Sequence, residues 1–255
     1  MTPQPRSRRK TYTPLKALIS EPAVKRAMPC LKWAGGKGQL LSSYEQYFPE
    51  EFKAYFEPFT GGAAVFFHLR AKHGSFDASL SDLNQELINC YAQIKNNLEQ
   101  LIISLRKHQN DESYFYEMRA QDPAQLSPLD RASRLMFLNK TCFNGLHRVN
   151  SKGQFNVPFG RYKNPAICNE VNLRAVHQAL QNTNLNCRPF DKVLEHAKKG
   201  DFVYFDPPYH PLSSTANFTS YTKNSFSAAD QEHLAETFAE LDKRGCLLML
   251  SNSDC

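Results

Sequence analysis

The chain has 255 residues, of which 41% are hydrophobic and 22% charged, as in a globular protein with one large domain or a domain carrying a smaller insert. No run approaches the roughly eighteen apolar residues of a membrane span, and MTPQPRSRRK at the N-terminus lacks the apolar core of a signal peptide. The net charge of +6 is unevenly placed, because residues 131–169 contain seven Lys and Arg and no acidic residue. Such a stretch suits a polyanion, with a solvated surface as the alternative.

The first half of the chain predicts a parallel sheet. Residues 1–29 are basic and proline-bearing without apolar periodicity, which predicts a basic flexible arm. Short apolar strands then alternate with longer helical patterns. The predicted elements are a strand at 54–59, a helix at 61–74, a strand at 76–82 and a long helix at 83–107. This alternation is typical of an α/β fold.

The middle of the chain breaks the alternation. Residues 111–142 predict helices only, and residues 143–158 alternate polar and apolar around NSKG, which predicts a β-hairpin with Gly153 in its turn. The remaining predicted elements are a helix near 170–182, strands at 184–188, 202–205 and 246–251, and a helix at 227–245 that opens on a Ser227–Asp230 capping box. We therefore predict a Rossmann-like, mostly parallel sheet in two pieces, 30–84 and 169–255, interrupted by a helical and hairpin-bearing insert at 85–168.

Two glycine-containing stretches are candidates for ligand binding. FEPFTGGAAVFF at 56–67 places a glycine pair between a strand and a helix, although tight strand–helix turns also use glycine for steric reasons alone. Asp82 ends the next strand, where a carboxylate can accept ribose hydroxyls; without GxGxxG, an adenosine-containing cofactor that lacks a pyrophosphate fits best. KWAGGK at 32–37 places the one tryptophan of the chain in a loop, which favours binding over core packing.

The stretch DFVYFDPPYHP at 201–211 carries more specific chemistry. Its prolines end the strand because they cannot donate to a sheet ladder, and most Asp-Pro pairs are simple turns. Asp206 and the prolyl carbonyls also form paired acceptors that suit a planar amino group on an aromatic ring, and Tyr209 offers a stacking face. A base in duplex DNA reaches such a pocket only when it is flipped out, and a basic insert that holds the duplex offsets part of that cost.

The order of these motifs resembles one enzyme family. KWAGGK, FEPFTGGAAVFF, LSDLNQELINCY, NGLHRVNSKGQFNVPFGRY and DPPYHPLSSTANFTSY, from about residue 30 onward, look like the Dam-type DNA adenine methyltransferases, which use S-adenosylmethionine to methylate adenine N6 in GATC. DPPY alone is shared by amino-methyltransferases acting on adenine, cytosine N4 or protein glutamine, whereas FNVPFGRY and LSSTANF are more specific. The chain departs from the family in its basic arm, in SNSDC where the family has SNHDT, and in stopping at Cys255 where the family continues; we therefore expect the last strands of the sheet to be missing.

The resemblance implies a role for each matching residue. Asp206 and Pro207 accept hydrogen bonds from adenine N6, and Tyr209 stacks on the flipped base. The implied cofactor contacts are Trp33, Lys37, Glu57, Phe59, Gly61, Asp82, Phe190 and Asp206. The implied DNA contacts are Lys32, Phe143, Leu146, Arg148, Asn150, Pro158, Arg161 and Tyr162, with Phe143 as an aromatic wedge where the family usually has Tyr. Arginine with guanine and an apolar side chain with a thymine methyl are the pairings expected in the major groove.

The expected reaction is direct methyl transfer to N6 without a covalent enzyme intermediate. Double-stranded DNA is the expected partner, and no membrane is expected; neither is a metal, because the seven cysteines form no CxxC and the eight histidines no HExxH. We expect a cytoplasmic monomer, prokaryotic and nucleoid-associated or encoded by a phage. Two alternatives stay open: a truncated, inactive protein that binds duplex DNA with sequence preference, and an RNA or protein amino-methyltransferase.

Overall fold

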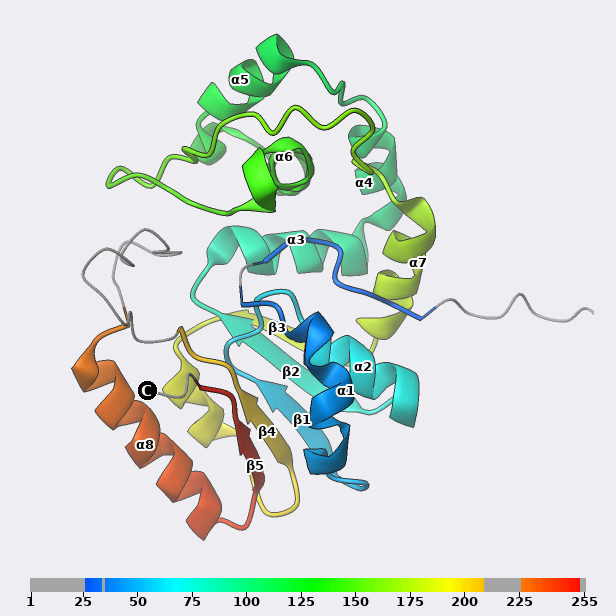
Figure 1. The fold of residues 1–255 in the computed structure, drawn as a ribbon. Helices are drawn as coiled ribbons and strands as arrows, with labels where there is room; N and C mark the ends of the chain where they lie inside the picture. The colour runs from blue at the N-terminus through cyan, green and yellow to red at the C-terminus, as the bar shows by residue number, and fades with distance from the viewer. Residues whose placement is uncertain (1–25, 34, 209–225, 253–255) are drawn as a thin grey trace, which may run out of the picture.

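The computed structural model describes residues 26–33, 35–208 and 226–252 of the chain (Figure 1). Its centre is a sheet of five strands: β1 (Ala54–Glu57), β2 (Asp77–Asp82), β3 (Thr183–Cys187), β4 (Phe202–Phe205) and β5 (Leu247–Leu250). The strands lie in the order β3-β2-β1-β4-β5, and each neighbouring pair is parallel. The predicted α/β fold with a parallel sheet is confirmed.

The middle of the sheet is covered on both faces, and β1 and β4 are accordingly apolar at nearly every position, whereas β2 (DASLSD) buries two serines. Along β4 the side chains alternate: Phe202 and Tyr204 face one core, whereas Val203 and Phe205 face the other. The first core is covered by α2 (Ala64–His73), α3 (Gln85–Asn96) and α7 (Glu170–Ala179), and the second by α8 (Ala228–Lys243). The helices thus form a layer on each side of the sheet, as Figure 1 shows.

The long helix predicted over residues 83–107 is wrong, because the structure divides it. Asn97, with φ −134° and ψ 37°, leaves the helical region and separates α3 from α4 (Leu98–Leu105). The break redirects the chain so that Leu101 and Leu105 of α4 are buried where this helix packs on α6 and α7. The apolar spacing continues across Asn97, so tertiary packing, not periodicity, places the break.

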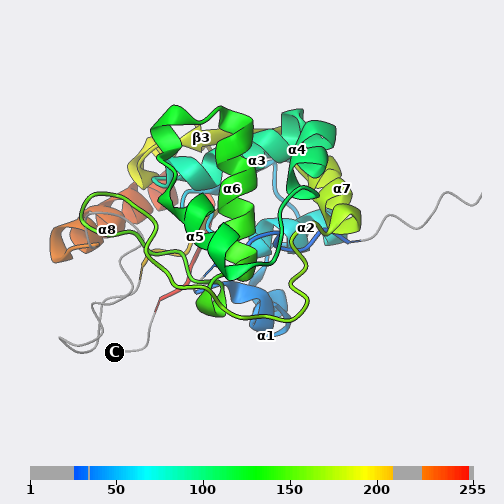
Figure 2. The same ribbon diagram turned by 90° about the horizontal axis from the view of Figure 1, so that it is seen from above.

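A helical layer and the hairpin lie above the sheet in Figure 1. The layer contains α5 (Glu112–Ala120) and α6 (Pro128–Thr141), and α6 packs on α3, α4 and α5. The predicted hairpin is present, but its pairing is limited to single bridges, Val149 with Phe155 and Cys142 with Phe159, in place of continuous strands. Buried side chains, Phe155 and Val157 among them, pack it against α5 and α6. Viewed from above in Figure 2, the hairpin extends toward the side that carries α8.

The end of the predicted flexible arm is fixed to the fold. Asn172 in α7 accepts a hydrogen bond from the Met28 amide at 3.0 Å and donates to the Met28 carbonyl at 2.9 Å. A terminal nitrogen of Arg26 lies 2.5 Å from Nδ1 of His68 in α2. Residues 26–29 therefore follow a defined path across α2 and α7.

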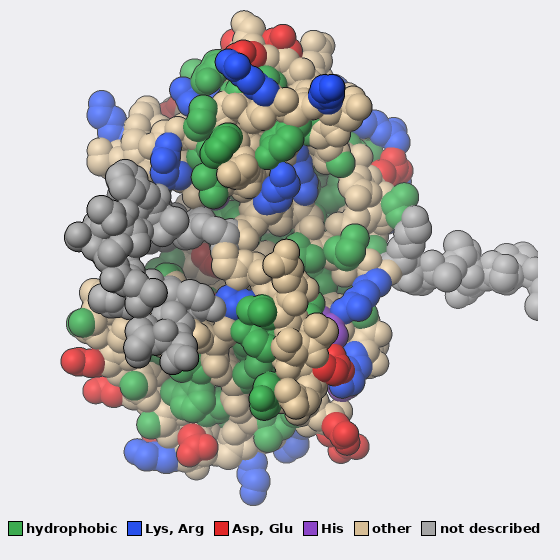
Figure 3. Space-filling model, viewed as in Figure 1, with side chains coloured by type: hydrophobic (Ala, Val, Ile, Leu, Met, Phe, Trp, Pro, Cys, Tyr) green, Lys and Arg blue, Asp and Glu red, His purple; other side chains and the backbone are tan. Residues whose placement is uncertain are grey.

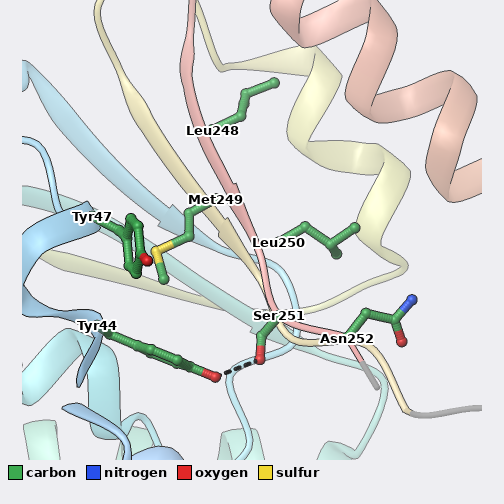
Figure 4. Close-up of a pocket in the computed structure, with 7 residues that line it drawn as sticks. All are labelled: Tyr44, Tyr47, Leu248, Met249, Leu250, Ser251 and Asn252. Carbon is green, nitrogen blue, oxygen red and sulfur yellow. Dashed lines mark hydrogen bonds between the residues drawn. The ribbon is translucent and has the colours of Figure 1, made fainter. Parts of the chain in front are cut away.

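The β5 edge of the described sheet is open. Figure 4 shows a hollow beside β5 that is lined by Tyr44 at the end of α1 (Leu41–Tyr44), by Tyr47, and by β5 and the two residues after it; the Tyr44 hydroxyl lies 3.0 Å from Oγ of Ser251. Tyr47 is 67% exposed and Leu250 41%. Among the described helices, none is long and apolar enough to cross a lipid bilayer.

We expect Asn172→Ala to free the segment at 26–29. The Met28 backbone would lose both hydrogen-bond partners, at a cost of about 1 kcal/mol in unfolding free energy, and hydrogen exchange of the Met28 amide would become faster. Exchange mass spectrometry of the N-terminal peptide measures this, with Gln178→Ala, an exposed position on the same helix, as the control. Unchanged protection at Met28 would show that other contacts hold the segment.

Candidate active site and DNA interface

Three acidic side chains meet at one edge of the sheet. β1 ends at Glu57, β2 ends at Asp82, and Asp206 directly follows β4. The three strands are neighbours in the order β2-β1-β4 and run parallel, so their carboxyl ends lie together. Open α/β sheets bind their ligands at this edge, which makes it the candidate active site.

Asp206 is held by an ion pair with Lys37. The Lys37 ammonium lies 2.5 Å from Oδ1 and 2.6 Å from Oδ2 of Asp206, and it donates to the Gly35 carbonyl at 2.7 Å. Lys37 is only 4% exposed, so its charge requires a partner. Burial raises the pKa of Asp206, and the Lys37 charge opposes that rise. The ion pair thus ties the KWAGGK loop to the end of β4.

Glu57 is buried beside Tyr55 of the same strand. It is 2% exposed, and its Oε2 accepts a hydrogen bond from the Tyr55 hydroxyl at 2.8 Å. Burial, reinforced by the negative charge of Asp206, raises the pKa of Glu57 to about 8, although the Tyr55 hydrogen bond and the Lys37 charge act in the opposite direction. Glu57 is therefore mostly protonated at neutral pH.

The loop between β1 and α2 is fastened to the end of β2. Thr60 Oγ1 donates toward the carbonyls of Glu57 at 2.9 Å and Ser81 at 3.0 Å. The Gly61 amide donates to Oδ2 of Asp82 at 3.0 Å, and the Asn84 amide donates to Oδ1 at 2.9 Å. Burial raises the pKa of Asp82, and these amides oppose the rise. The Asp82 carboxylate thus sits beside the glycine loop.

Aromatic rings flank this loop on two sides. Gly61 has φ 45°, and a Cβ there would lie 2.9 Å from Cδ1 of Trp33, so the glycine backbone packs directly on the indole. Phe59 stacks on Phe190 with 5.3 Å between ring centroids. The structure therefore brings the predicted cofactor residues into one neighbourhood.

The DPPY motif is described only in part. Pro207 is buried beside Asp206, whereas Tyr209 lies outside the described residues. No group of three or more His, Cys, Asp or Glu side chains among residues 26–33, 35–208 and 226–252 is arranged to hold a metal ion.

Asn139 in α6 joins the KWAGGK segment to the start of the hairpin. Its Oδ1 accepts from the Lys32 amide at 2.8 Å, and its Nδ2 donates to the carbonyls of Lys32 at 2.8 Å and Gly145 at 3.0 Å. Gly145 has φ 64°, and a Cβ there would lie 2.1 Å from Cδ of Lys32, so only glycine fits. The Lys32 ammonium lies 4.6 Å from the centre of the Tyr162 ring, which brings two predicted DNA contacts together.

Hydrogen bonds made by side chains hold the hairpin in shape. Nε of Arg148 donates to Oδ1 of Asn156 at 2.7 Å, and a terminal nitrogen reaches the Asn156 carbonyl at 3.3 Å. Oδ1 of Asn150 accepts from the amides of Lys152 and Gln154, both at 3.0 Å, which shapes the turn. The guanidinium of Arg148 is therefore positioned before any ligand arrives.

The other predicted DNA contacts lie at the surface near the hairpin. Phe143 is 51% exposed, and its amide donates to the carbonyl of Pro158, itself exposed, at 2.9 Å. Leu146 is partly buried against the small core of the helical layer. Arg161 is exposed, with φ 53°, and its guanidinium lies 3.7 Å from Glu112.

Residues 33–255 match the family model for D12 class N6 adenine-specific DNA methyltransferases. The chain belongs to this family. It is 46% identical over 233 residues to the type II methyltransferase M1.LlaDCHI of Lactococcus lactis subsp. cremoris, with 88% of this chain and 81% of that one aligned. It is 45% identical over 242 residues to M.MjaIII of Methanocaldococcus jannaschii, covering 88% and 84%, and 37% identical over 228 residues to the DNA adenine methylase of Salmonella typhi, covering 88% and 80%. The predicted family and enzyme class are confirmed.

Part of the acid-free basic stretch serves the methyltransferase fold itself. Arg131 makes a two-pronged ion pair with Glu86 of α3, and Arg134, 5% exposed, donates to the last carbonyls of α5, those of Met118 and Arg119, at 2.7 and 2.8 Å. The expectation that the whole stretch faces a polyanion is therefore too broad. In the face shown in Figure 3, Lys and Arg side chains lie both on the helical layer and on the sheet region below it.

Sequence reasoning missed the residues that position the site: Tyr55, Thr60, Tyr91, Asn139 and Asn156. The Tyr91 hydroxyl donates to the Gly61 carbonyl at 2.9 Å. The two residues are far apart in the sequence, so no local pattern predicts this contact. Tyr55 lies two residues before Glu57 and therefore on the same face of the strand, so its contact with the Glu57 carboxyl could have been predicted from the sequence. Asn139 was visible as one polar residue within an apolar helical run.

The raised pKa of Glu57 predicts that stability falls with rising pH. An unfolded glutamate ionises near its ordinary pKa of 4.5, whereas folded Glu57 keeps its proton to about pH 8, so the folded state binds more protons in this window. The unfolding free energy should therefore decrease by a few kcal/mol between these pH values. Urea unfolding across the window should show that Glu57→Gln lacks this decrease, whereas Glu50→Gln, at an exposed position, keeps it. An equal slope in Glu57→Gln and the unmodified protein would contradict a protonated Glu57.

Proposed function

We propose that the protein transfers a methyl group from S-adenosylmethionine to N6 of a flipped adenine in duplex DNA, with GATC as its target. The observation that carries the proposal is the partly buried Asp206 carboxylate at the carboxyl end of β4, on the strand next to the one that ends at Glu57 and near the glycine loop that Asp82 holds. Membership of the N6 adenine family fixes the class of reaction. The cofactor, the target sequence and the roles of individual residues are the proposed part.

The pocket chemistry fits the proposed cofactor. Asp82 uses one lone pair on each oxygen for an amide and keeps acceptor sites for ribose hydroxyls. Gly61 leaves no room for a side chain against Trp33, so the backbone can approach a ligand closely. Phe59 and Phe190 offer an aromatic face for an adenine ring. When bound, S-adenosylmethionine supplies an electrophilic methyl group on a sulfonium.

Asp206 and the Pro207 carbonyl would receive the target base. Two acceptors aligned with the amino group take its protons and leave the nitrogen lone pair directed at the methyl donor. Lys37 contacts both oxygens of Asp206, so the carboxylate accepts from N6 through its remaining lone pairs while the ammonium keeps it ionised. Tyr209 would stack on the flipped ring.

The hairpin side would read the target sequence. Arg148 fits a guanine edge because Asn156 already orients its guanidinium, and Leu146 and Pro158 fit apolar contact with bases. Lys32 would reach the first guanine, and exposed Phe143 would fill the gap left by the flipped base. Three residues would contact the DNA backbone: Asn150, Arg161 and Tyr162.

Nucleoside mass spectrometry tests the proposal directly. The purified chain is incubated with S-adenosylmethionine and unmethylated plasmid, and the digested DNA is scanned for N6-methyladenine. A rise confined to GATC supports the reaction, the cofactor and the target. No methyladenine together with salt-sensitive duplex binding would favour the inactive duplex-binding alternative. Methylation of RNA or protein substrates instead would favour the other amino-methyltransferases.

Replacing Asp206 should separate methylation from DNA binding. Asp206→Ala removes an acceptor for N6, so single-turnover methylation should fall by about 100-fold or more, while duplex affinity by fluorescence anisotropy stays within a few-fold. Asp206→Asn keeps the size of the side chain and serves as a second variant, because alanine leaves the buried Lys37 without its carboxylate. Equal losses of methylation and binding would contradict the role given to Asp206.

Replacing Arg148 should relax sequence preference. We expect Arg148→Ala to lower discrimination between GATC and sites that differ at one guanine by about 1–3 kcal/mol. Lys152→Ala, an exposed residue in the turn of the same hairpin, is the matched control. It should weaken all duplexes alike, as loss of a phosphate contact does. Competition binding with single-base variants measures both, and intact discrimination in Arg148→Ala would remove this residue from readout.

A further inference from the structure

His147 lies between two predicted base-reading residues yet points away from solvent. It separates Leu146 from Arg148 in the hairpin and is 7% exposed. Its imidazole stacks on the indole of Trp33, with 5.0 Å between ring centroids and 25° between ring planes, and meets the Phe155 ring edge-on at 5.9 Å. The hairpin therefore touches the KWAGGK segment through an aromatic pair.

Trp33 carries this contact onward to the glycine loop. The Gly61 backbone packs on Cδ1 of the indole, and a Cβ at Gly62 would lie 3.5 Å from the Trp33 Cβ. Gly61 in turn donates to Asp82 and accepts from Tyr91. A continuous chain of contacts thus runs from the hairpin, through His147 and Trp33, to the carboxylate at the end of β2.

Packing stability alone does not account for a histidine at this position. Nδ1 of His147 is buried and has no hydrogen-bond partner among the described residues, which costs stability that an apolar ring would not cost. Burial lowers the pKa of His147 to about 4, so the ring is neutral at physiological pH and stacks as an uncharged aromatic group. Buried polar atoms without a partner are uncommon in folded proteins, so this one calls for a reason other than packing.

We propose that His147 is a positioning residue that couples recognition of the target sequence by the hairpin to the conformation of the cofactor loop, through its stacking on Trp33. The inference rests on the proposed function, because it requires that the hairpin binds DNA and that the Gly61 loop binds the cofactor. Coupling between two binding sites is reciprocal, so the cognate duplex must tighten cofactor binding by the same factor as the cofactor tightens the duplex.

Calorimetry with S-adenosylhomocysteine, which carries no methyl group to transfer, measures this factor. Its Kd is determined for the protein alone, with a GATC duplex and with a duplex of scrambled sequence. In the unmodified protein we expect the GATC duplex to tighten S-adenosylhomocysteine about 5-fold or more, and the scrambled duplex to have a much smaller effect.

Two substitutions isolate the stacking contact. His147→Leu fills the space without a ring, and His147→Phe keeps a ring and removes the unpartnered nitrogen. We expect His147→Leu to reduce the coupling below about 2-fold while each Kd measured alone changes only a few-fold, and His147→Phe to retain most of the coupling. A merely structural role would instead change the separate Kd values and leave their ratio intact.

The outcomes distinguish this inference from the proposed function. Coupling in His147→Leu equal to that of the unmodified protein overturns the role of His147, as does independent binding of both ligands to the unmodified protein. In either case GATC methylation by the unmodified protein leaves the proposed function standing. Failure of the unmodified protein to bind S-adenosylhomocysteine or the duplex, together with no methylation, overturns both.

Discussion

Three carboxyl groups at one edge of a parallel sheet, Glu57 buried and Asp82 and Asp206 partly buried, are the constraint on which the site depends. A carboxylate removed from water is destabilising unless it is compensated, and each of the three is compensated differently. Asp82 receives two backbone amides, Asp206 receives an ammonium, and Glu57 keeps its proton. The compensating groups include the Gly61 amide of the glycine loop and Lys37 of the KWAGGK segment, so neutralising these carboxylates also fixes the loops that surround the site.

The Lys37–Asp206 pair sets the electrostatic state of this edge. With Glu57 protonated, the ammonium and the Asp206 carboxylate nearly cancel, so the site next to β1 and β4 carries little net charge before a ligand arrives. A cationic ligand placed beside Glu57 favours its ionised form, because an opposite charge lowers the pKa of a carboxyl group. In the proposed complex, binding of a sulfonium beside Glu57 and release of the Glu57 proton are therefore linked, because burial is what raises the pKa of this carboxyl.

The pattern of apolar residues along the chain was enough to predict the sheet and the acidic residues at its strand ends, because strand–helix alternation and strand-ending residues are local features. It did not predict the features that are set by packing between distant segments. The spacing of apolar residues continues through Asn97, where the helix breaks, and the hairpin alternates correctly yet pairs at single bridges only. Asn139 and Tyr91 position the site from helices distant in sequence, and nothing local connects either to the glycine loop or the hairpin. Short-range patterns thus indicate where the candidate site residues lie, whereas the residues that hold them in place are brought there by contacts between segments remote in sequence.

The density of basic residues in the sequence is a weaker guide to the proposed DNA interface than the contacts that each basic side chain makes in the structure. Arg131 and Arg134 lie in the most basic part of the sequence, yet a carboxylate of α3 and the end of α5 occupy them. The basic residues of the hairpin have few such partners among the described residues, and Arg148 is held by an amide that leaves its charge uncompensated. Because the hairpin has almost no ladder of its own, its shape depends on α6 and on the stacking of His147 on Trp33. The hairpin proposed to face DNA therefore rests on the segment proposed to face the cofactor.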